Sequence, residues 1–161
     1  MAPELHLYHP RTASCLDVIC SGFFDSVGLY RACSPAQQDV ARAWMERLGL
    51  DGPERTFGAL SEGEQRLTLI ARALVKEPRL LILDEPCQVL DVRNSVRVLE
   101  AVDAATERMA TSLVYVTHRA DEMPRAITHV LRLDGGVVVG AGPWNRTFDL
   151  AGRSSAEQSP V

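Results

Sequence analysis

The sequence predicts an α/β fold in which a helical subdomain precedes the rear part of a mainly parallel sheet. Residues 80–83 are four consecutive apolar residues, as in a strand that is buried on both faces of a parallel sheet. Helical patterns alternate with strand patterns from residue 80 onward, which implies right-handed crossovers. Only two central strands are expected, so we interpret residues 1–150 as part of a larger α/β domain.

Local start and stop signals predict the first half of the helical subdomain, which covers about residues 12–76. A short helix is expected at 16–19, followed by an apolar loop that glycines interrupt. Residues 34–37 form a capping box with proline at the first helical position. The helix that begins there is expected to stop near Gly49 and to bury one face, formed by Val40, Trp44 and Leu48.

A second helix is predicted after Ser61, beyond a polar loop at 51–59. It should end before Pro78 and point four residues inward: Leu67, Ile70, Ala71 and Leu74.

The sheet-forming part covers about residues 78–142. The expected elements are a strand at 80–84, a helix at 92–108, a strand at 112–117, a short helix near 120–126, and strands at 128–133 and 136–140. The last two strands are joined at Asp134-Gly135, which resembles a hairpin turn. The helix should bury a stripe formed by Val92, Val96, Leu99 and Val102. Residues 151–161, rich in Ser and Ala, are expected to be a flexible tail.

Composition excludes several classes of protein. The chain has 161 residues, of which 46% are hydrophobic and 24% are charged, as in a soluble globular domain. A net charge of −4 argues against a general nucleic-acid binder. No apolar stretch approaches the roughly 18 residues of a membrane span, and no signal peptide is evident. The four cysteines lack CxxC pairing, so we expect small buried thiols and no zinc site.

Two adjacent carboxylates, Asp84 and Glu85, follow the first strand directly. Ligands of parallel sheets bind beyond the carboxyl ends of the strands. Carboxylates at this edge can serve phosphoryl transfer, one by holding Mg²⁺ through water and the other by polarising the attacking water. The phosphate-binding loop G-x-x-x-x-G-K-[ST] is missing from this sequence, whose only lysine is Lys76. Carboxylates suited to using a nucleotide are thus present without the main device for holding one.

Four motifs occur in one order along the chain. They are Leu60-Ser61-Glu62-Gly63-Glu64-Gln65-Arg66, the strand with its carboxylates at 80–86, Cys87-Gln88-Val89-Leu90-Asp91, and Tyr115-Val116-Thr117-His118. Together they resemble the signature motif, Walker B, D-loop and switch histidine of an ABC-type ATP-binding cassette. That resemblance implies a partial P-loop NTPase fold that lacks Walker A.

A closer resemblance is to the second cassette of ModF-type molybdenum-transport ATP-binding proteins, also called photorepair proteins. It rests on Leu5-His6-Leu7, Asp17-Val18-Ile19, the segment from Ser21 to Tyr30, and Ile127-Thr128-His129. It extends from about residue 2 to residue 140.

The resemblance implies a role for three residues around the strand ends. Asp84 matches the aspartate that orders Mg²⁺, Glu85 the catalytic glutamate, and His118 the switch histidine that contacts the γ-phosphate. Structural interpretations stay open beside these: a turn-forming acid for Asp84, a solvated carboxylate beside Pro86 for Glu85, and a structural histidine for His118.

Further residues match the face that meets a partner's nucleotide. Ser61 and Gly63 match the signature motif at a helix N-terminus, where Ser61 can also be an N-cap. Glu64 stands where the family has glutamine, and it brings negative charge that an arginine such as Arg66 would have to offset. Asp91 fits either the D-loop aspartate or an N-cap. Glu4 falls about where the Q-loop glutamine would be, and Glu62, in place of the usual glycine, should face solvent.

The resemblance implies ATP binding and hydrolysis, with ATP and Mg²⁺ shared with a partner. In this family each nucleotide lies between the Walker A loop of one cassette and the signature motif of the other. The expected partner is therefore another cassette or the missing Walker A-bearing half and, through it, a membrane permease, at a cytoplasmic or peripheral inner-membrane location. Alternatives are a degenerate cassette that modulates a complete ATPase through its signature face, and a decaying fragment.

Overall fold

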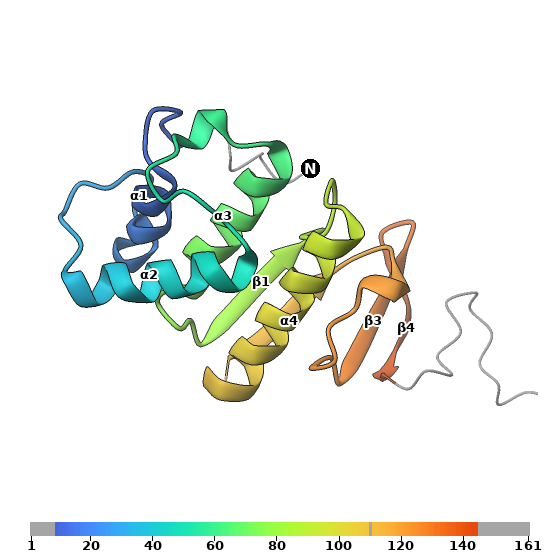
Figure 1. Ribbon diagram of the computed structural model, residues 1–161. Helices are drawn as coiled ribbons and strands as arrows, with labels where there is room; N and C mark the ends of the chain where they lie inside the picture. Colours follow the sequence, from blue (N-terminus) through green and yellow to red (C-terminus); the bar gives the residue numbers. More distant parts are fainter. Residues whose placement is uncertain (1–8, 110, 145–161) are drawn as a thin grey trace, which may run out of the picture. The chain divides into compact units, whose positions relative to one another are not determined.

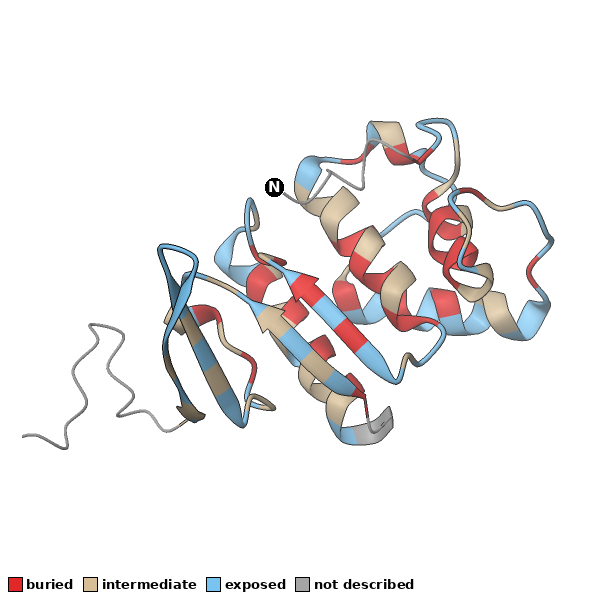
Figure 2. Ribbon diagram, turned by 180° about the vertical axis from the view of Figure 1, so that it is seen from behind, coloured by how far each residue is buried: buried red, intermediate tan, exposed pale blue. Residues whose placement is uncertain are grey.

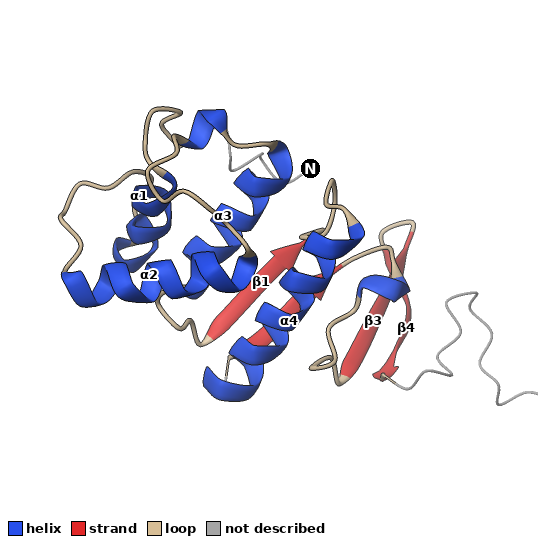
Figure 3. Cartoon of the chain, in the orientation of Figure 1, coloured by secondary structure: helices blue, strands red, loops and turns tan. Residues whose placement is uncertain are grey.

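The computed structural model describes residues 9–109 and 111–144, and the chain divides into two compact units after Pro124. The first unit contains helices and a parallel pair of strands, in the order α1 (Cys15–Cys20), α2 (Pro35–Leu48), α3 (Glu62–Leu74), β1 (Leu80–Asp84), α4 (Val92–Met109) and β2 (Ser112–Val116) (Figure 1). The second unit contains the hairpin of β3 (His129–Asp134) and β4 (Val137–Pro143) (Figure 3). The predicted α/β fold class is thus confirmed, while Glu4, the 5–7 segment and the 151–161 tail lie outside the described residues.

Helix α2 begins and ends where its local signals predicted, and α1 is one residue longer at each end than the predicted 16–19. The Ser34 side chain accepts a hydrogen bond from the Gln37 N–H, and the Gln37 side chain accepts one from the Ser34 N–H. Gly49 ends α2 in the left-handed conformation, with φ 67°. The buried face of α2 differs from the prediction because Val40 is 40% exposed, and the face consists of Ala41, Trp44, Met45 and Leu48.

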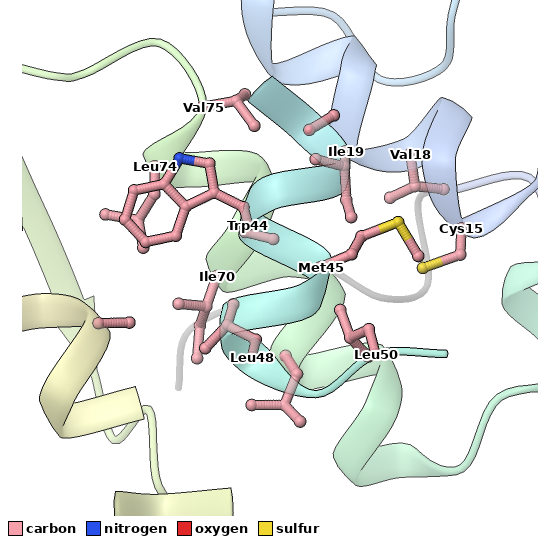
Figure 4. Packing of buried hydrophobic residues seen from close by; sticks show 14 of the residues in the cluster. Cys15, Val18, Ile19, Trp44, Met45, Leu48, Leu50, Ile70, Leu74 and Val75 are labelled. Atoms are coloured by element: carbon pink, nitrogen blue, oxygen red, sulfur yellow. The ribbon is translucent and has the colours of Figure 1, made fainter. Parts of the chain in front are cut away.

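A hydrophobic cluster joins α1, α2 and α3. Figure 4 shows Ile19 of α1, Met45 and Leu48 of α2, and Ile70 and Leu74 of α3 gathered together. All four inward residues predicted for α3 are buried. The cysteines are free buried thiols, as expected, and no group of three or more metal-binding side chains occurs among the described residues.

The sheet of the first unit is a parallel pair in which Leu80 lies opposite Ser112 and Asp84 opposite Val116. The prediction that β1 is buried on both faces is wrong, because only Leu81 and Leu83 are buried. The physical reason is that helices cover only one of the two faces of this strand pair. In Figure 1, α4 lies over one face of the pair, whereas in Figure 2 no helix of the described chain covers the other face.

The buried stripe of α4 is also displaced from the predicted one. Val102 is fully buried, but Val92 is 82% exposed and Val96 is 46% exposed. The residues that point inward are Ser95, Val98, Ala101, Val102 and Ala105. Two of these buried residues are valines, like the exposed Val92 and Val96, so residue type alone does not decide which side of α4 is buried.

The second unit is an antiparallel hairpin with a register shift between Arg132 and Leu133. Its turn differs by one residue from the prediction, since Asp134 pairs with Val137 and the two central residues are Gly135 and Gly136. Both glycines have positive φ, 54° and 80°, as a two-residue hairpin turn requires. In the first unit, the short helix expected near 120–126 is instead a single 3-10 turn at Ala120–Glu122.

Candidate functional site

The carboxylates that follow β1 are presented by a sharp change of backbone direction. β1 ends at Asp84, whose side chain shares the uncovered face of the strand with Leu80 and Ile82. Glu85 then adopts a left-handed conformation with φ 47°, and its N–H donates a hydrogen bond to the Val116 carbonyl at 2.9 Å. This bond ties the turn after β1 to the end of β2.

Glu85 and His118 contact each other directly, although 33 residues separate them in sequence. Glu85 Oε1 accepts a hydrogen bond from the His118 backbone N–H at 3.1 Å and lies 2.8 Å from His118 Nδ1. The Glu85 side chain is 26% exposed and the His118 side chain 72%. In a neutral ring whose Nδ1 donates its proton to Glu85, Nε2 can only accept a hydrogen bond. In a cationic ring Nε2 also carries a proton, and it can then donate a hydrogen bond to an anion.

Asp84 offers a carboxylate that its surroundings leave available. It is exposed, and no hydrogen bond or ion pair to another residue in the described part of the chain engages its side chain. A lone carboxylate of this kind fits Mg²⁺, which usually takes one or two protein carboxylates and completes its shell with water and phosphate oxygens.

Ser61 and Glu64 form a second capping box at the start of α3. The Ser61 hydroxyl accepts a hydrogen bond from the Glu64 N–H at 3.3 Å, and Glu64 Oε2 accepts one from the Ser61 N–H at 2.8 Å. From the sequence, the charge of Glu64 would weaken the contact with a triphosphate unless an arginine such as Arg66 offset it. The structure instead brings Arg55 onto it, with Nη1 2.5 Å from Oε1 and Nη2 3.2 Å from Oε2.

The Arg55 guanidinium holds the pKa of the Glu64 carboxyl below its ordinary value, and the hydrogen bond from Ser61 adds to the effect. Glu64 is therefore a paired carboxylate at the first turn of α3, while Glu62 is exposed, as predicted. No local pattern marks Arg55, because the contact depends on how the loop before Ser61 folds.

Gly63 lies beside the loop that follows β1. A Cβ built on Gly63 would be 3.4 Å from Leu90 Cδ2, so the first and third of the four motifs are neighbours in space. Asp91 ends this loop as the N-cap of α4, where its Oδ1 accepts a hydrogen bond from the Asn94 N–H at 2.8 Å. One of the two interpretations of Asp91, the structural one, is thus observed.

The same loop is held to β2 by a contact that sequence reasoning missed. The buried Cys87 Sγ lies 3.4 Å from the Tyr115 hydroxyl. Burial raises the pKa of both groups, which keeps them uncharged. This neutral contact lies between the Asp84-Glu85 turn and the strand that leads to His118.

Lys76 takes no part in this cluster. Its ammonium is paired with the Asp25 carboxylate, which holds the pKa of Asp25 below its ordinary value. None of the helices in the described ranges is long and apolar enough to cross a membrane.

Comparison with known proteins gives consistent matches over most of the chain. The family model described as ABC transporter matches residues 5–88. The ABC transporter ATP-binding protein ModF of Escherichia coli (strain K12) is 43% identical over 141 residues, which are 85% of this chain and 29% of ModF. The uncharacterized ABC transporter ATP-binding protein YlmA of Bacillus subtilis (strain 168) is 37% identical over 131 residues, 80% of this chain and 50% of YlmA.

The fold is likewise similar to that of a solved structure. The dimeric structure of a bacterial ABC transporter cassette superposes with a TM-score of 0.70 at 22% identity, covering 84% of this chain and 58% of that one. The chain thus spans half or less of these curated relatives and little more than half of the solved cassette.

Proposed function

Because the chain belongs to the ABC transporter family of ATP-binding proteins, we propose that it binds and hydrolyses ATP only when a Walker A-bearing half or partner cassette completes it. The observation that carries the proposal is the contact between Glu85 and His118, beside Asp84, at the carboxyl ends of two parallel strands. Completion by a Walker A-bearing polypeptide is required because the phosphate-binding loop motif does not occur in this sequence.

Each of the three residues at this edge has a task that suits its surroundings. Asp84, exposed and unengaged within the described residues, would hold Mg²⁺ through water. Mg²⁺, when bound, supplies positive charge to the phosphate oxygens of ATP. Glu85 would orient the attacking water and draw its proton, in a position fixed by the His118 N–H. His118 Nε2, directed by the Nδ1 contact with Glu85, would contact the γ-phosphate.

The uncovered face of the β1–β2 pair is consistent with a completing polypeptide. Leu80 and Ile82 of β1 are 54% and 63% exposed, and Val114 and Val116 of β2 are 46% and 47% exposed. Parallel sheets are normally covered on both faces. We propose that the Walker A-bearing polypeptide packs on these four residues, beside Asp84.

A reconstitution experiment tests the proposal. The purified chain alone should show no ATP hydrolysis above background, and a Walker A-bearing half of a ModF-type cassette should restore it. In the restored complex, Glu85→Gln should lower the rate about 10²–10⁴-fold, the usual loss when a positioned acid–base group is removed. Glu46→Gln, on the exposed side of α2, is the matched control. Robust hydrolysis by the chain alone that Glu85→Gln abolishes would contradict the condition, and a mixture without activity would contradict the proposal as a whole.

The cap of α3 favours a second candidate function, a non-catalytic cassette that modulates a complete ABC ATPase through Ser61 and Gly63. Helix N-termini bind phosphate groups, and pairing with Arg55 offsets the charge of Glu64 there. In this case the chain should change the ATPase rate of a complete cassette, and Glu85→Gln should retain that effect. Loss of the effect in Glu85→Gln would favour the catalytic proposal. In either case, the partner would be the link to a membrane permease on the cytoplasmic side.

A further inference from the structure

The Glu64 carboxylate lies in the first turn of α3, next to the two residues that we propose face a partner's phosphate, Ser61 and Gly63. A negative side chain at a helix N-terminus stabilises the helix itself. It also repels an anionic ligand that approaches the same helix end. A neighbouring cationic side chain is therefore needed to keep the Glu64 carboxylate in the capping box and to offset its negative charge.

Arg55 is placed to provide this positive charge. Its two terminal nitrogens each contact a different Glu64 oxygen, at 2.5 and 3.2 Å, so the pair is bidentate. Nη2 is also 3.5 Å from the Ala59 carbonyl. Glu64 Oε2 additionally accepts the hydrogen bond from the Ser61 N–H at 2.8 Å, which turns the carboxylate back along the helix end.

The backbone of Arg55 is fixed independently of this contact. Its carbonyl accepts a hydrogen bond from the Cys15 N–H at 2.8 Å, at the first residue of α1. Its N–H donates to the Gly52 carbonyl at 2.9 Å. The guanidinium thus reaches Glu64 from a loop anchored to another helix, so the charge at the start of α3 depends on a residue nine positions earlier.

We propose that Arg55 is a positioning residue for the signature motif: it holds Glu64 in the capping box and offsets its charge, so that the N-terminus of α3 can accept the γ-phosphate of an ATP bound by a partner. This inference rests on the proposed function and adds a requirement to it. Arg55 should be needed only while residue 64 is a carboxylate.

A double-mutant cycle in the reconstituted complex tests that requirement. Arg55→Met should raise the KM for MgATP about fivefold or more, because Glu64 is left unpaired. Glu64→Gln should lower the KM, since it removes the negative charge and releases the arginine. The double variant should return to within about twofold of the wild type. Arg42→Met, at an exposed position of α2, is the matched control and should leave the KM unchanged.

The rescue separates a charge effect from a folding defect. Loss of Arg55 as a structural contact would persist in the double variant, whereas its electrostatic effect would not. An Arg55→Met complex with wild-type KM, or a double variant as impaired as Arg55→Met, would overturn the inference and leave the proposed function standing. A wild-type complex without activity would overturn both. Independently, the NMR titration midpoint of the Glu64 carboxyl should rise in Arg55→Met, and an unchanged midpoint would also overturn the inference.

Discussion

Gly63 and Gly22 differ in the space that surrounds them. Among the described residues, a Cβ on Gly63 would meet only Leu90 Cδ2 at 3.4 Å, an ordinary contact distance. A Cβ on Gly22 would lie 2.1 Å from the Arg72 carbonyl oxygen, which cannot move without the helix. The space around Gly63 within this chain therefore does not explain a glycine, whereas the space around Gly22 does.

We predict opposite effects of Gly63→Ala and Gly22→Ala. Gly63→Ala should leave the free energy of unfolding within about 0.5 kcal/mol of the wild type or raise it, because alanine is the better helix former. The same change should lower ATP hydrolysis in the reconstituted complex at least about tenfold, because a methyl group blocks close approach of a phosphate to the helix end. Gly22→Ala should cost about 1–3 kcal/mol through the backbone clash. Urea unfolding and the ATPase assay measure the two effects, and full activity of the Gly63→Ala complex would contradict the proposed role.

His9 is a buried histidine whose ring packs beside Phe57. It is 3% exposed, neither ring nitrogen has a hydrogen-bond partner among the residues that the structure describes, and its ring lies 5.9 Å from that of Phe57. Burial, with a smaller contribution from Arg72, lowers the pKa of His9 below its ordinary value of 6.5. The folded protein therefore favours the neutral form of this ring over the charged form.

Stability should consequently fall in mild acid. Below about pH 6.5 the unfolded chain binds a proton at His9 more readily than the folded chain does, so the free energy of unfolding falls as the pH drops. The contribution is complete above that pH and amounts to at most about 1.4 kcal/mol per pH unit below it. Urea unfolding at pH 7.5 and 5.5 should show a smaller loss in His9→Phe than in the wild type. His129→Gln, at an exposed position, should keep the wild-type loss; an equal loss in His9→Phe would contradict the assignment.

Elements whose signals lie within a few residues followed the sequence closely. The capping boxes at Ser34 and Ser61, the stop at Gly49 and the hairpin glycines are all local, and each marks an end in the structure. Burial was predicted less well, because the exposed side of an element depends on what packs against it. Val40, Val96 and Ile82 fit apolar patterns, yet each is exposed.

The residues of the candidate site likewise fall into those whose position could be predicted from the sequence and those whose position could not. Glu85 and His118 both follow strands of one parallel pair, so their positions at a common edge could be predicted from the order of elements. Arg55 and Tyr115 could not be, because each reaches its partner through the folding of a loop or the packing of a strand. Neither residue type carries a signal of its own.

The loop between β1 and α4 contains two residues with left-handed backbone, Glu85 and Val89, with φ of 47° and 65°. At Glu85, the hydrogen bonds to Val116 and His118 offset the cost of the left-handed conformation. Val89 is 62% exposed and β-branched, a residue type for which this conformation is a genuine outlier. Strain of this kind is typical of loops at functional sites.

We predict that Val89→Gly stabilises the protein. Relief of the left-handed strain, about 1–2 kcal/mol, exceeds the extra entropy that glycine gives the unfolded chain, so a gain of about 0.5–1 kcal/mol is expected. Val96→Gly, in the interior of α4, should instead cost about 1 kcal/mol. Thermal or urea unfolding of the two variants provides the comparison, and destabilisation by Val89→Gly would show that the valine side chain contributes more than its strain.

At the scale of the whole molecule, the largest departure from an ordinary α/β protein is the bare face of the β1–β2 pair. Leu80, Ile82, Val114 and Val116 form an exposed apolar surface on adjacent strands, with Ile82 directly opposite Val114. Contiguous apolar surfaces of this kind mark interaction sites or sites of aggregation. The proposed function assigns this surface to the Walker A-bearing polypeptide.

Ile82→Thr together with Val114→Thr should separate these two consequences of exposure. Because both side chains are about half exposed, the variant should change the free energy of unfolding by less than about 1 kcal/mol while it reduces self-association of the chain alone. Loss of two apolar contacts should weaken binding of the Walker A-bearing half about tenfold or more, as measured by titration calorimetry. Val92→Thr with Val96→Thr, on the exposed side of α4, also replaces two exposed β-branched apolar residues by threonine and should leave that binding at the wild-type level. The reverse pattern, with binding lost on α4 and kept on the sheet, would place the completing polypeptide on the helix and leave the bare sheet face without a partner.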